Sequence, residues 1–187
     1  MKPGRATSYT RMAIGLHWLM ALLIVVAFGL GWTLAGMENS PQKLRWMAWH
    51  KWLGITVLGL TAFRLAWRLA HPAPPLPAAM PAWQKMAAQA VHFLLYGLMF
   101  VIPLSGWLFS SARGFTVVYL GVLPLPDLIG ADEQLGDRLR MVHEWLNYTL
   151  LAAFGAHVGA ALKHQFIERD GVMARMLPQR GRKERLR

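Results

Sequence analysis

The chain has 187 residues, of which 55% are hydrophobic and 16% are charged, with nine tryptophans and no cysteine. This composition is atypical of a water-soluble domain and indicates a membrane protein. The absence of cysteine excludes disulfides, iron–sulfur ligation by cysteine and cofactor attachment through Cys-x-x-Cys-His. The net charge of +11 would suggest nucleic acid as a partner of a soluble protein. In a membrane protein it indicates Lys- and Arg-rich cytoplasmic segments instead, so we expect no nucleic-acid partner.

Four apolar segments are expected to cross the bilayer as helices, at residues 12–35, 46–69, 83–109 and 139–164. The first is too long for the apolar core of a signal peptide, so we interpret it as a retained span. The proline-rich residues 71–77 predict a stiff, extended connector. The prolines of residues 110–137 argue against a further span and favour an interfacial loop. The sequence therefore predicts an all-α fold, a transmembrane four-helix bundle forming one domain over residues 1–187, with a basic tail at 168–187.

The basic residues are distributed unequally between the connections. Fourteen of the twenty Lys and Arg residues lie at the amino end, around the second connection and in the tail. The first and third connections hold the other six, together with most of the acidic residues. By the positive-inside rule, both termini are predicted to be cytoplasmic.

Four histidines lie at matching depths in this topology. His143 and His157 are fourteen residues apart in the fourth segment. A helix places them about 40° apart in direction and roughly 21 Å apart along its axis, so they share one face. His17 lies near the cytoplasmic start of the first segment, and His50 lies near the opposite start of the second. The topology therefore pairs His17 with His157 on the inner side and His50 with His143 on the outer side.

Paired imidazoles inside an apolar bundle favour a haem over the alternatives. A lone histidine in a membrane helix usually forms a hydrogen bond to a neighbouring helix. Such hydrogen bonds do not explain why four histidines lie in pairs at matching depths. Zinc commonly takes four ligands, and a proton relay usually includes carboxylates, which these spans lack at mid-depth. A porphyrin is flat and apolar, fits between helices, and its iron takes one imidazole on each face. The sequence therefore predicts two haem groups with His17, His50, His143 and His157 as iron ligands, an arrangement that favours electron transfer.

Three further polar residues, Arg64, His92 and His71, also require interpretation. Arg64 follows His50 by fourteen residues, so it shares that face at the depth of the inner pair. It is expected either to bind a haem propionate or to extend to lipid headgroups. His92 is interpreted as a structural residue or haem neighbour, and as a second candidate for contact with a quinone; His71 is interpreted as a loop residue.

Several motifs between residues 11 and 178 resemble those of one family. They are Gly-Leu-His17-Trp-Leu, His50-Lys51-x-Leu-Gly54, His71-Pro-x-Pro-Pro-x-Pro77, His92-x-x-Leu-Tyr96, Pro103-Leu-Ser-Gly-Trp-Leu, Ser111-Ala-Arg-Gly, His143-Glu-Trp-Leu, His157-x-x-x-Ala-Leu-Lys-His164 and Arg169-Asp-Gly-Val-Met-Ala-Arg-Met-Leu-Pro178. Together they resemble the bacterial cytochrome b561 family, small four-helix proteins of the inner membrane that hold two b-type haems. The resemblance implies the same four histidines as axial ligands. Trp52 and Gln165 depart from the common pattern, and Gln165 replaces a second histidine that often follows His164.

The resemblance also implies an activity, superoxide oxidation with ubiquinone as the electron acceptor. Lys51 and Arg113, with Lys43 and Arg45, lie on the outer side, where they are expected to attract an anion or simply to be solvated loop charges. His164 lies beyond His157 at the inner edge, where a histidine can hydrogen-bond a quinone carbonyl and deliver a proton.

Two alternatives remain open at the level of the sequence. One is a quinol-linked cytochrome that relays electrons to or from a dehydrogenase or a periplasmic redox partner. The other is a haem-free anchor or transporter whose histidines serve packing or proton transfer.

Overall fold

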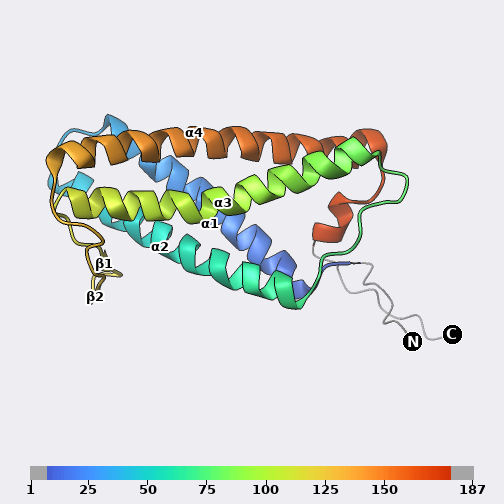
Figure 1. Ribbon diagram of the computed structural model, residues 1–187, viewed down its shortest axis with the longest axis horizontal. Coiled ribbons are helices and arrows are strands. Elements are labelled where there is room, and N and C mark those ends of the chain that lie inside the picture. The colour runs from blue at the N-terminus through green and yellow to red at the C-terminus, as the bar shows by residue number, and fades with distance from the viewer. Residues whose placement is uncertain (1–7, 178–187) are drawn as a thin grey trace.

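The computed structural model describes residues 8–177 and is dominated by four long helices (Figure 1). These are α1 (Arg11–Gly36), α2 (Pro41–Ala70), α3 (Ala82–Ala112) and α4 (Glu133–Lys163). Helix α4 packs along α3, and α2 contacts both α1 and α3. The chain after α4 continues as a π-helical turn, η1 (His164–Glu168), and a 3₁₀ turn, η2 (Met173–Met176). The predicted all-α helical bundle is confirmed.

Side-chain caps define where three of the helices begin. The hydroxyl of Thr10 accepts a hydrogen bond from Ala13 N, that of Ser40 accepts from Lys43 N, and the Asp132 carboxylate accepts from Leu135 N. Such caps satisfy backbone N–H groups that have no partner within the helix. Helices α2 and α4 consequently begin five and six residues before the predicted spans, because their caps lie upstream of the apolar residues.

The connection between α3 and α4 forms a short antiparallel ribbon, β1 (Val118–Tyr119) and β2 (Leu123–Pro124). Its turn places Leu120 and Gly121 in the left-handed region, at φ 53° and 74°. Trp52 Nε1 donates a hydrogen bond to Val118 O over 2.7 Å, which attaches the ribbon to α2. The predicted interfacial loop therefore packs over the end of α2 that carries His50.

Helices α1, α2 and α3 are long and apolar enough to cross a membrane. Helix α4 does not reach the same hydropathy, although it runs the length of the bundle beside α3 (Figure 1). It nevertheless exposes large apolar side chains, among them Met141, Trp145 and Leu151. Three of the four predicted spans are thus supported by hydropathy, and the crossing by α4 stays a prediction.

Apolar side chains cover the outside of the bundle as well as its centre. A small buried cluster at mid-bundle joins α3 to α4, and its members are Leu98, Ile102, Leu150 and Ala153. Outside it, Phe93 is 83% exposed and Trp32 66% exposed. An apolar exterior of this kind is suited to lipid rather than water.

The two ends of the described chain lie together, at the end of the bundle opposite the β-ribbon (Figure 1). Trp18 Nε1 donates a hydrogen bond to Met176 O over 2.7 Å, and Arg175 donates one to Pro75 O over the same distance. The carboxyl-terminal turn η2 is thereby tied to α1 and to the connection between α2 and α3. This arrangement agrees with a chain whose two ends lie on one side of a membrane; the cytoplasmic assignment rests on the charge distribution.

Candidate functional site

The outer histidine pair joins α2 to α4 at the ribbon end of the bundle. The ring centres of His50 and His143 lie 6.3 Å apart, with the ring planes at 87°. His50 Nδ1 lies 2.9 Å from Ala27 O, and His143 Nδ1 lies 3.1 Å from Ile102 O. Because a carbonyl only accepts, His50 Nδ1 carries the proton and donates it. His143 Nδ1 also lies 2.9 Å from Ser105 Oγ, and because this hydroxyl donates its own hydrogen to Ile102 O, His143 Nδ1 is the donor there too. Nε2 is then the nitrogen of each ring that could bind a metal.

The ring spacing fits a metal ion between two imidazoles. An ion bound to two facing imidazole nitrogens by bonds of about 2 Å places the ring centres about 6.3 Å apart. The inner pair, His17 of α1 and His157 of α4, has nearly this separation, 6.1 Å at an interplanar angle of 74°. The structure therefore brings together both predicted pairs at spacings that suit an iron.

Two glycines allow helix backbones to approach the outer imidazoles closely. A Cβ atom on Gly31 would lie 3.1 Å from His50 Cε1, and one on Gly106 would lie 3.0 Å from His143 Cε1. A side chain larger than hydrogen at either glycine would therefore crowd the imidazole ring. A cavity between the helices continues from the two rings and is otherwise mainly apolar; its other lining residues are Ile24, Ala27, Phe28, Gly54, Val57, Leu98, Met99, Ile102, Pro103, Asn147 and Leu150. Neutral imidazoles facing an apolar cavity are what a porphyrin requires.

A third histidine lies next to the inner pair. The ring of His92, on α3, has its centre 5.1 Å from that of His157. This separation is too short for two rings that bind an ion from opposite sides, whereas the His17–His157 spacing of 6.1 Å suits that arrangement. The geometry thus supports His17 as the partner of His157, with His92 as a neighbour.

Arg64 points into the bundle at the inner pair. Its Nη2 donates a hydrogen bond to His17 Nδ1 over 3.1 Å, and its guanidinium lies 5.6 Å from the centre of the Tyr96 ring. This inward direction favours the propionate interpretation over extension toward lipid headgroups. Because Nδ1 accepts here, a neutral His17 carries its proton on Nε2; ligation through Nε2 requires Arg64 to release Nδ1. A negatively charged partner for Arg64, such as a propionate, would promote that release.

The predicted outer cations occupy different surroundings. The Lys51 ammonium lies 5.6 Å from the centre of the Phe115 ring. Arg113 forms ion pairs with Asp137 and with Glu133, the second at 3.7 Å, and its side chain packs against Gly136. The charge of Arg113 is therefore balanced by carboxylates of α4. These ion pairs hold the start of the α3–α4 connection against α4.

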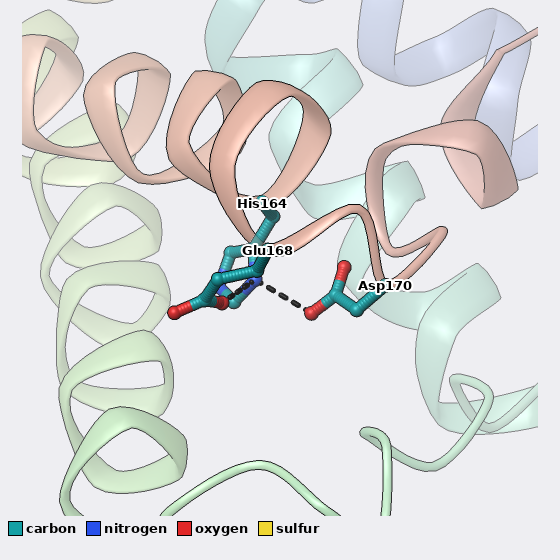
Figure 2. Close-up of side chains that lie close together, drawn as sticks. All are labelled: His164, Glu168 and Asp170. Atoms are coloured by element: carbon teal, nitrogen blue, oxygen red, sulfur yellow. Dashed lines mark hydrogen bonds and ion pairs between the residues drawn. The ribbon is translucent and has the colours of Figure 1, made fainter.

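His164 lies at the end of α4 within a polar cluster (Figure 2). Its Nδ1 forms a hydrogen bond with Asp170 Oδ2 over 2.7 Å and an ion-pair contact with Glu168 Oε2 over 2.6 Å. The histidine was predicted from the sequence as a site residue, and the two carboxylates were not. Their spacing, His-x-x-x-Glu-x-Asp directly after an apolar helix, is the signal that was available.

Comparison with known proteins identifies relatives over nearly the whole chain. A family profile described as prokaryotic cytochrome b561 matches residues 8–179. Cytochrome b561 homolog 2 of Escherichia coli (strain K12) is 33% identical over 173 residues, covering 90% of each chain. Cytochrome b561 homolog 1 of the same organism is 30% identical, covering 92% of this chain and 98% of its own. The Yersinia pestis protein named probable superoxide oxidase CybB is 28% identical, covering 92% and 97%.

A bundle of apolar helices with inward-facing histidine pairs defines the class of membrane electron-transfer cytochromes. The chain belongs to the prokaryotic cytochrome b561 family. Membership in this family implies haem b binding and a multi-pass protein of the inner membrane, and it confirms the resemblance drawn from the motifs.

Proposed function

We propose that the protein is a di-haem oxidoreductase that oxidises superoxide at the outer end of the bundle and reduces ubiquinone at the inner end. The observation that carries this proposal is the presence of two histidine pairs, one toward each end of the bundle, with ring centres 6.3 and 6.1 Å apart. The name of the Yersinia pestis relative supports superoxide as the electron donor.

His50 and His143 would hold the outer haem, and His17 and His157 the inner one. When bound, these groups would supply one-electron transfer across the membrane. The backbone carbonyls of Ala27 and Ile102 orient the outer imidazoles. The Arg64 guanidinium supplies positive charge for a propionate at the inner group.

Lys51 is the residue we propose to attract superoxide. It adjoins His50, and among the described residues its ammonium is in contact with the Phe115 ring. Arg113 would contribute a second charge, reduced by its pairing with Glu133 and Asp137. A cation beside the outer haem raises the local concentration of an anionic substrate.

His164 is the residue we propose at the ubiquinone end. Asp170 and Glu168 fix its Nδ1, so Nε2 is the nitrogen that would face a quinone carbonyl. Reduction of one ubiquinone to ubiquinol consumes two electrons, from two superoxide ions that leave as oxygen, and two protons. A histidine paired with carboxylates can donate a proton and then recover one from the aqueous side.

Steady-state ubiquinone reduction by purified protein with a superoxide generator tests the proposal. We expect haem reduction, followed by ubiquinol formation that superoxide dismutase abolishes. Lys51→Gln should lower the rate with superoxide roughly tenfold and flatten its dependence on salt. Lys85→Gln, which removes a lysine that caps Ala78 O near the start of α3, is the matched control and should leave the rate unchanged.

The same assay tests the ubiquinone end. His164→Ala should keep both haems and slow ubiquinol formation by a factor of about 100, the lower range for loss of a general acid. His71→Ala is the control, because His71 stacks on Trp67 at the end of α2. Haem reduction by ubiquinol but not by superoxide would contradict the proposal and favour the alternative, a relay to or from a dehydrogenase or periplasmic redox partner.

A further inference from the structure

We propose that His164, Glu168 and Asp170 form a binding site for a divalent transition metal of the zinc class (Figure 2). The site is separate from the histidine pairs that would hold haem. His164 is also the residue proposed at the ubiquinone end; a metal ion would take its Nδ1 and leave Nε2 to face the quinone.

Three donor atoms converge from the end of α4 and the turn that follows. Glu168 Oε2 lies 2.6 Å and Asp170 Oδ2 lies 2.7 Å from His164 Nδ1. One ligand atom from each of the three residues lies within 4.8 Å of the others. Metal bonds of about 2.0–2.2 Å therefore require small side-chain rotations rather than a rearrangement of the backbone.

Each carboxylate has one oxygen held by an outer partner and the other directed at the histidine. Glu168 Oε1 accepts hydrogen bonds from Lys163 Nζ over 2.8 Å and from Gln84 Nε2 over 3.0 Å. Asp170 Oδ1 accepts from Val172 N over 3.1 Å. Such outer partners are what orient the ligands in metal sites.

A single proton does not suit this arrangement as well as a divalent cation does. His164 Nδ1 carries at most one hydrogen, yet two carboxylate oxygens lie within 2.7 Å of it. The hydrogen bond is made to Asp170, while the closer Glu168 oxygen makes an ion-pair contact. A metal ion accepts all three lone pairs at once and balances the two negative charges.

The residue that holds Glu168 from α3 also carries a buried acceptor. Gln84 Oε1 is buried and has no hydrogen-bond partner among the described residues, although the same amide donates to Glu168. A buried polar atom is normally satisfied. Three protein ligands leave a coordination position for water, and a metal-bound water is a strong donor for such an oxygen.

The ligand set selects the class of metal. One imidazole and two carboxylates suit zinc and cobalt, whereas magnesium and calcium prefer oxygen ligands alone. Zinc is also favoured over manganese by the general order of affinities.

Zinc binding to the full-length, haem-loaded protein in detergent micelles tests the site, because loaded haems keep the paired histidines from binding zinc. Isothermal titration with zinc chloride should give one ion per chain. Cobalt chloride should give a visible absorption band of a nitrogen- and oxygen-ligated ion. Asp170→Asn and Glu168→Gln should each weaken zinc binding by at least about tenfold. Glu38→Gln, a carboxylate at the other end of the bundle, is the matched control and should bind as wild type.

Soret absorbance identifies variants that fold and load haem. A variant that keeps this absorbance but loses zinc supports the site, and magnesium chloride should not compete. Zinc binding that survives Asp170→Asn, Glu168→Gln and His164→Ala would overturn the proposal, as would the absence of any binding by wild type. Neither outcome depends on superoxide turnover, so a failure here is distinguishable from a failure of the proposed function.

Discussion

Two glycine positions determine how close a helix backbone comes to the outer imidazoles. Gly106 lies on α3 opposite His143, and Gly31 lies on α1 opposite His50. Because the hypothetical Cβ atoms fall within 3.1 Å of ring carbons, each ring is positioned by the absence of a side chain as much as by its hydrogen bond. The outer pair is thus assembled from all four helices, although only two of them supply ligands.

This dependence predicts the effect of a single methyl group. Gly106→Ala should displace the His143 ring and, if the chain holds the two haems proposed above, reduce the haem content of the purified protein from two per chain toward one. Gly97→Ala is the matched control on the same helix, because its Cβ would meet nothing within 4 Å. The pyridine haemochrome assay measures haem per chain. Equal haem content in the two variants would show that the ring tolerates the contact.

The pairing of the four candidate ligand histidines was predictable from sequence, and the groups that orient their rings were not. A histidine in an apolar segment is conspicuous, and depth and topology sufficed to pair His17 with His157 and His50 with His143. The carbonyls of Ala27 and Ile102 have no residue signature, because any residue supplies a backbone oxygen. Which of them meets an imidazole depends on how closely the helices approach.

At the scale of elements, the helix starts show which bounds hydropathy predicts and which depend on the capping residue. The start of α1 was predicted to within one residue, since Thr10 caps it directly before the apolar run. The starts of α2 and α4 were placed too late because hydropathy, not capping, defined the predicted bounds. Ser40 with Pro41, and Asp132, were local signals that were available in each case.

The far end of α4 is attached to α3 by contacts that span distant parts of the sequence. Gln84 Nε2 of α3 and Lys163 Nζ of α4 both donate hydrogen bonds to Glu168 Oε1. Hydrogen bonds from Lys163 and then Gln84 lower the pKa of the Glu168 carboxyl below its usual value. A carboxyl group with a lowered pKa stabilises the folded state above its unfolded pKa of about 4.3, and this contribution is lost as pH falls through the folded pKa.

This linkage predicts a pH-dependent difference between wild type and Glu168→Gln. At pH 7 the variant should show faster amide hydrogen exchange over residues 164–168, by about two- to fivefold as expected for an exposed ion pair. At a pH below both values the carboxyl is protonated and the two proteins should exchange alike. Because each comparison is made at one pH, the intrinsic exchange rate cancels. A difference that persisted unchanged in acid would contradict the electrostatic explanation.

At the scale of the whole molecule, an apolar exterior and two adjacent chain ends constrain how the bundle lies in a bilayer. Helices α1, α2 and α3 qualify as spans by hydropathy, and three crossings alone would separate the chain ends. The described ends are instead tied together through Trp18 and Met176. A crossing by α4 reconciles these facts, and its polar residues are then expected to face the haem sites or the membrane surfaces.

The absence of cysteine from the chain makes this topology directly testable. We expect a membrane-impermeant maleimide, added to intact spheroplasts, to label Asn39→Cys between α1 and α2 and Val122→Cys in the β-ribbon. It should label Ala79→Cys and Ala174→Cys only after lysis. These four side chains are exposed and lie in the three connections and beyond α4. Labelling of Val122→Cys and Ala174→Cys from the same side would show that α4 does not cross the membrane. If Ala79→Cys and Ala174→Cys were labelled in intact spheroplasts and the other two only after lysis, the positive-inside assignment would be wrong.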